Sequence, residues 1–204
     1  MANLPVPNTM QVDVLFRLYN QIVENVYHVE APDGVDAVAL DDCKNMMAGW
    51  VTGNLMPLMS SDLVFTGLVV TNLSIEGGSQ VTFEQVGGLP GTIGSAAEPG
   101  NVSYCISSRT DRIGRSYRGR KYIAGIPANK RTGNTIDATW AGQLVAEFNA
   151  LIDFLQTLNL FLVVVSRTLD NVERLVPVTT RVLNHTTTDL FIDSQRRRLT
   201  GRGT

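Results

Sequence analysis

The chain has 204 residues, of which 44% are apolar and 18% are charged, and its formal net charge is −2. This length supports one domain with a substantial core. No apolar run reaches the roughly 18 residues that a membrane-spanning helix needs, and the first residues lack the basic and apolar segments of a secretory signal. We therefore expect a protein that is made in a cytoplasm and has no membrane contact.

The first quarter of the chain predicts a β-hairpin followed by a helix. Residues 10–30 are rich in β-branched and aromatic side chains, and apolar and polar residues alternate, which favours two strands with a turn near Asn20. One helix is the alternative for this segment. Residues 31–34 have turn chemistry, with a proline and a glycine. Residues 37–56 predict a helix whose apolar stripe consists of Leu40, Cys43, Met47, Trp50 and Val51.

The central part of the chain predicts strands. Two are expected at residues 63–73 and 80–86, and a glycine- and proline-rich loop follows at 87–100. A short strand at 101–108 then leads into an arginine-rich segment, and another strand is expected at 120–126. Several strands in succession with few intervening helices indicate antiparallel pairing.

Residues 136–158 form the clearest helical pattern, because apolar side chains recur at three- and four-residue spacing. Thr135 is the expected N-cap. A buried strand is predicted at 161–167, with further β-like stretches at 174–182 and 189–193. The fold class is therefore expected to be α+β, with an antiparallel sheet and two main helices in a single domain spanning 1–195; a jelly-roll β-sandwich is the alternative. Residues 196–204 are expected to be a flexible, arginine-rich tail.

A search of the sequence for catalytic groups yields little. His28 and His185 have no metal-ligand spacing to another histidine, cysteine or carboxylate. Cys43 and Cys105 are interpreted as buried thiols, with a disulfide as the alternative. We therefore expect no enzyme activity, no metal and no cofactor.

Positive charge is concentrated in two segments. Residues 1–108 carry two bases and eleven acids, whereas residues 109–131 carry eight bases and one acid, and residues 196–204 carry four arginines. Arginine binds phosphate bidentately and tyrosine stacks on unpaired bases, so this pattern predicts nucleic-acid binding. Pairing with acids of a neighbouring subunit and a plain solvated loop are the alternatives. The candidate residues are Arg109, Arg112, Arg115, Tyr117, Arg118, Arg120, Lys121, Arg196, Arg197, Arg198 and Arg202.

Residues 108–120 (SRTDRIGRSYRGR) and 192–203 (IDSQRRRLTGRG), with the intervening helix and the LVVVSR sequence at 162–167, resemble short structural proteins of small viruses with single-stranded genomes, of the kind known from environmental sequencing. The resemblance covers roughly the C-terminal half. It implies a coat protein that assembles with copies of itself into an icosahedral shell and contacts single-stranded nucleic acid, RNA being favoured. It also implies a place in the virion, and in the host cytoplasm during assembly. Familiar coat proteins often carry the basic arm at the N-terminus, which is uncharged here. A non-assembling protein that binds single-stranded nucleic acid is the alternative.

Overall fold

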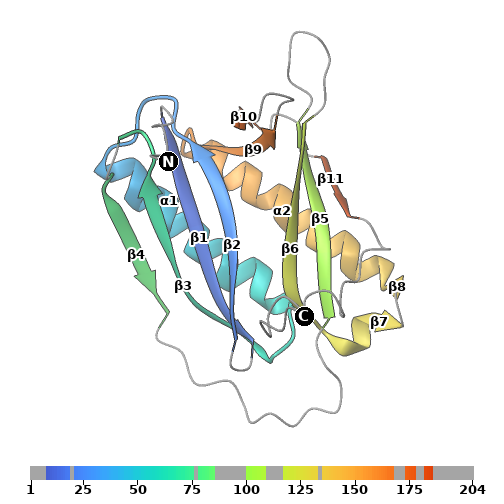
Figure 1. The fold of residues 1–204 in the computed structure, drawn as a ribbon. Coiled ribbons are helices and arrows are strands. Elements are labelled where there is room, and N and C mark those ends of the chain that lie inside the picture. Colours follow the sequence, from blue (N-terminus) through green and yellow to red (C-terminus); the bar gives the residue numbers. More distant parts are fainter. Residues whose placement is uncertain are drawn as a thin grey trace, which may run out of the picture.

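Alternating apolar residues and two amphipathic segments produce an antiparallel α+β fold in the computed structural model of the chain (Figure 1). The structure describes residues 8–18, 21–75, 78–85, 100–108, 117–132, 135–167, 173–177 and 182–185.

The largest sheet has six strands in the order β10–β9–β2–β1–β3–β4, and every neighbouring pair is antiparallel. The sheet begins as a hairpin, because β1 and β2 pair along their whole length, with Thr9 opposite Glu30 and Leu18 opposite Gln21. β9 reaches this sheet from the C-terminal half and pairs with the end of β2. The strands are β1 (Thr9–Leu18), β2 (Gln21–Glu30), β3 (Leu63–Asn72), β4 (Gln80–Glu84), β9 (Phe161–Arg167) and β10 (Glu173–Pro177).

A second sheet has three strands in the order β11–β5–β6, where β5 is Gly100–Ser108, β6 is Tyr117–Ile126 and β11 is Val182–His185. β6 contacts β2 and β9, so this sheet lies beside the larger one, on the side of β2 that faces away from β1 (Figure 1). The short strands β7 (Arg131–Thr132) and β8 (Thr135–Ile136) form a separate pair.

Two main helices lie behind the strands in Figure 1. Helix α1 (Ala37–Trp50) begins at Asp36, whose carboxylate accepts a 2.8 Å hydrogen bond from the backbone N–H of Ala39. It continues into a π-helical turn, η1 (Val51–Leu55), and a 3₁₀ turn, η2 (Met56–Leu58). Another 3₁₀ turn, η3 (Ala128–Lys130), follows β6.

Helix α2 (Ala138–Thr157) begins at Asp137, whose carboxylate accepts a 2.7 Å hydrogen bond from the backbone N–H of Trp140. It ends where Asn159 adopts a left-handed conformation with φ 54°. Among the described residues, neither helix is long and apolar enough to cross a membrane.

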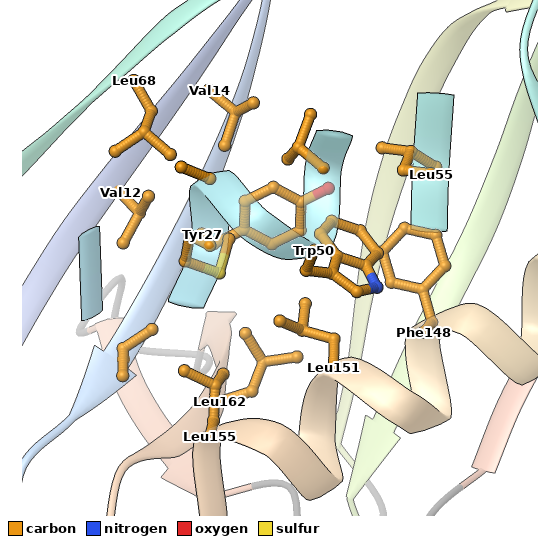
Figure 2. Close-up of a cluster of buried hydrophobic side chains, with 14 of the residues drawn as sticks. Val12, Val14, Tyr27, Trp50, Leu55, Leu68, Phe148, Leu151, Leu155 and Leu162 are labelled. Carbon is orange, nitrogen blue, oxygen red and sulfur yellow. The ribbon is translucent and has the colours of Figure 1, made fainter. Parts of the chain in front are cut away.

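The core lies between the helices and the inward face of the larger sheet. On β1, every second side chain is buried: Met10, Val12, Val14, Phe16 and Leu18. Figure 2 shows Tyr27 and Trp50 between these strand residues and Leu151 and Leu155 of α2. The Trp50 ring contacts the ring of Phe148, with a centroid separation of 5.0 Å.

Polar contacts hold the two helical segments together. The indole Nε1 of Trp50 donates to the backbone carbonyl of Glu147 at 2.8 Å, and Asn54 Nδ2 donates to the carboxylate of Glu147 at 2.6 Å. In the other direction, Trp140 Nε1 donates to the carbonyl of Leu58 at 2.8 Å. Each buried indole thus has a hydrogen-bond partner, as burial of a polar N–H requires.

The predicted α+β class, with an antiparallel sheet and two helices, is confirmed, and the jelly-roll alternative is wrong. The hairpin in residues 10–30 and the strand at 161–167 are also confirmed. Thr135 is not the N-cap of α2. It belongs to β8, and Asp137 has the capping carboxylate. The stretch predicted at 174–182 splits into β10 and the first residue of β11. Residues 87–99, the stretch at 189–193 and the tail at 196–204 lie outside the described residues.

Candidate nucleic-acid interface

The structure places part of the arginine-rich segment in strand β6. This strand begins at Tyr117, three residues before the predicted start at Arg120. Tyr117, Arg118, Arg120 and Lys121 therefore all have strand positions. The remaining candidates lie outside the described residues: Arg109, Arg112, Arg115, Arg196, Arg197, Arg198 and Arg202.

A strand has a two-residue period, so β6 divides its candidate residues between two faces. Positions 118 and 120 share one face, and position 122, a tyrosine, follows them on that face. Positions 117 and 121 are on the opposite face. The three-residue spacing of the arginines in the sequence therefore does not describe their arrangement in β6.

The register with β5 adds further positions to each face. Ser107 is opposite Arg118, Cys105 is opposite Arg120, and Ser103 is opposite Tyr122. Directly opposed residues in an antiparallel pair lie on the same face. Ser103, Ser107 and Tyr122 are not among the residues predicted for the interface, although Tyr122 interleaves with the basic residues in the sequence. The two-residue period of 117–126 is the signal that could have included Tyr122.

The other face of β5 and β6 has a different composition. Tyr104 is opposite Lys121, Val102 is opposite Ile123, and Ile106 is opposite Gly119. On β11, Leu183 is opposite Ile106 and therefore belongs to this face. The three-stranded sheet thus has one face with both arginine positions and another on which these apolar residues are mixed with Tyr104, Lys121 and His185.

The outward face of the larger sheet is acidic. Glu24 and Glu84 are exposed there, and Asp13 and Glu30 are half-buried. Arg17 is the only arginine or lysine at the outward positions of β1 to β4. One cross-strand row runs from Glu24 through Leu15 and Gly67 to Glu84. The two exposed carboxylates therefore lie at the two ends of the same row. Such a surface repels phosphate, which directs a polyanion to another part of the molecule.

Metal-ligating groups are not clustered in the described part of the chain. It contains no cluster of three or more histidine, cysteine or carboxylate side chains that could hold a metal ion. His28 is half-buried in β2, opposite Gln11 and Val163, whereas His185 is in β11. Cys43 is a free, buried cysteine, and burial raises the pKa of its thiol to about 12, so it remains protonated and a poor nucleophile at neutral pH.

No family model matches this chain, and no match was found among curated proteins or solved structures.

Proposed function

We propose that this protein is a structural viral coat protein that self-assembles into a shell and contacts the packaged single-stranded genome through its arginine-rich segments. The partners are other copies of the chain and single-stranded nucleic acid, with RNA favoured. The proposal assigns no catalytic role and no cofactor, and it places the protein in the virion and, during assembly, in the host cytoplasm.

The separation of charge is the observation that carries this proposal. The outward face of β1 to β4 has four carboxylates and one arginine, whereas residues 109–131 carry eight bases and one acid. A coat protein has one side toward the genome and another side away from it, so separate basic and acidic surfaces suit this role. Neutralisation of phosphate charge by arginine and lysine provides most of the affinity for nucleic acid that does not depend on base sequence. The resemblance of 108–120 and 192–203 to viral structural proteins supports the same function.

The rigidity of the described core also suits a shell subunit. Both indoles are buried and hydrogen-bonded between helical segments, and five alternate residues of β1 belong to the same buried cluster. A subunit repeated many times in a closed shell must present the same contacts in each copy, which requires one well-packed conformation.

Purification of the expressed chain provides the test. We expect uniform particles in negative-stain micrographs, elution near the void volume in size-exclusion chromatography, and a 260/280 nm absorbance ratio that indicates packaged nucleic acid. Deleting residues 196–204 should lower that ratio and leave the circular dichroism spectrum unchanged.

The alternatives give different results. A chain that binds nucleic acid but elutes as a monomer at high concentration is the non-assembling binding protein. Particles that carry no nucleic acid and dissociate in high salt indicate that the arginines pair with acids of neighbouring subunits.

A further inference from the structure

We infer that the face of the three-stranded sheet that holds positions 118, 120 and 122 is a platform for single-stranded nucleic acid, to which Ser103, Ser107 and Asn184 also belong. This inference rests on the proposed function and specifies where the genome is bound. It assigns Lys121 and Tyr117, which are adjacent in sequence to the platform residues, to the other side of the sheet.

The spacing of residues along β6 suits an extended nucleic-acid strand. Alternate residues of a strand are about 7 Å apart, so positions 118, 120 and 122 form a straight row of two arginines and one tyrosine. An extended single strand presents phosphates and bases in a repeating line. Two guanidinium groups can bind successive phosphates while an aromatic ring stacks on an unpaired base.

Strands β5 and β11 add polar residues beside positions 118, 120 and 122. Ser107 is opposite Arg118, and Ser103 is opposite Tyr122, at the roughly 5 Å separation of paired strands. Asn184 of β11 is opposite Cys105, which is itself opposite Arg120. Two hydroxyl residues and one amide residue therefore have positions beside the row, together with Cys105 and Val182. Hydroxyl and amide groups hydrogen-bond to phosphate and sugar without selecting a base sequence.

The opposite face of this sheet has no pair of arginines. Val102, Ile106, Ile123 and Leu183 have positions on that face, together with Tyr104, Lys121 and His185. Helix α2 contacts β11, the edge strand of this sheet.

The acidic outward face of the larger sheet excludes the main competing location. Glu24 and Glu84 are exposed there, and a phosphate backbone near them would be repelled. Within the described residues, the polar face of β5 and β6 is the sheet surface that brings two arginines together with hydroxyl and aromatic residues.

Neighbouring residues on opposite faces provide matched variants. The binding of a short fluorescent oligouridylate to the full-length chain is measured by anisotropy at several salt concentrations. The arginine pair is replaced in Arg118→Gln/Arg120→Gln, and Lys121→Gln is the control on the other face. Arg118→Lys/Arg120→Lys retains both charges, and Tyr122→Leu is paired with Tyr117→Leu. Circular dichroism and thermal unfolding establish that each variant folds.

We expect the double glutamine variant to lower the log–log salt slope by roughly 1.4, which corresponds to two phosphate contacts at about 0.7 each. The double lysine variant should keep the slope, and Lys121→Gln should leave it unchanged. Tyr122→Leu should weaken binding by roughly tenfold at an unchanged slope, because loss of stacking removes no ion contact.

A decrease of the slope by roughly 0.7 in Lys121→Gln, equal per replaced charge to that of the double glutamine variant, would overturn the face assignment while leaving the proposed function standing. An unchanged slope in the double glutamine variant, together with weaker particle assembly, would overturn the platform and identify a protein partner for these arginines. A wild-type chain without salt-dependent binding would overturn the proposed function itself.

Discussion

The indole of Trp50 and the backbone carbonyl of Glu147 are joined by a 2.8 Å hydrogen bond between residues that are 97 positions apart in the sequence. The bond connects the end of α1 to the middle of α2, and the Trp50 ring packs on Phe148 beside it. We expect Trp50→Phe to lower the free energy of unfolding by about 2 kcal/mol, because it removes the donor and leaves a void in a closely packed region. Urea unfolding monitored by circular dichroism measures this change.

Glu147→Gln is the control for that variant. It keeps the backbone carbonyl that Trp50 uses and an amide oxygen that can accept from Asn54, so it should change stability by less than about 0.5 kcal/mol. Equal losses in the two variants would mean that the Glu147 side chain, rather than the indole contact, holds the helices together.

Gly67 allows the close pairing of β3 and β4 at the bulge near Leu15. Its φ is +152°, and an added Cβ would meet the carbonyl oxygen of Phe83. Gly67→Ala should therefore destabilise the fold by about 2 kcal/mol or more, through strain and displacement of β4. Gly142→Ala is the matched control, because nothing lies within 4 Å of the new methyl group and alanine favours the helix by about 1 kcal/mol. A loss of stability in Gly142→Ala as large as that in Gly67→Ala would contradict this reading.

The N-terminus of α2 gives a prediction about capping. Asp137→Ala should cost about 1 kcal/mol, because the Trp140 N–H then loses its carboxylate partner. Thr135→Ala, two residues earlier, should have a much smaller effect since Thr135 is outside the helix. Thermal unfolding of both variants distinguishes the two positions, and a larger decrease in Tm for Thr135→Ala would show that the cap is assigned to the wrong residue.

Cys43 gives a prediction about pH. Burial disfavours the thiolate and raises the pKa of Cys43 from its ordinary value of 9.0 to about 12. The unfolded chain therefore loses this proton first as the pH rises, so the contribution of Cys43 to stability is complete below pH 9 and is lost between about pH 9 and 12.

Thiol labelling in a Cys105→Ser background isolates Cys43. At pH 8 the native protein should react with a disulfide reagent only as fast as it opens, and urea should accelerate the reaction. Rapid labelling without denaturant would contradict the burial of this side chain, which is 0% exposed.

The sequence predicted those features of the fold that depend on local periodicity. Alternation in residues 10–30 indicated the β1–β2 hairpin, and the three- and four-residue spacing of Trp140, Leu144 and Phe148 indicated α2. It did not predict that β9 pairs with β2, because the partner of a strand is chosen by packing between distant segments. The cap of α2 was missed because Thr135 and Asp137 both have suitable side chains, and the local backbone decides between them.

The candidate interface was predicted only in part. Composition located the arginine-rich segment. The three-residue spacing of its arginines does not assign them to one face or the other until the secondary structure is known. Once β6 extends back to Tyr117, the two-residue period separates Arg120 from Lys121. The polar partners Ser103 and Ser107 come from β5, and their pairing follows from strand register rather than from proximity in the sequence.

The order of the elements has a consequence for synthesis on the ribosome. The core cannot close until α2 has left the exit tunnel, and at 5–20 residues per second the interval between residues 50 and 157 takes roughly 5–20 s. Strands β5 and β6 are made within that interval. A nascent chain that stops before β6 therefore lacks α2 and the seven buried side chains that α2 contributes to the core, and such a fragment is exposed to proteases. Every chain that is long enough to form the Trp50–Glu147 hydrogen bond already contains β6. Only chains that contain β6 can therefore close the core.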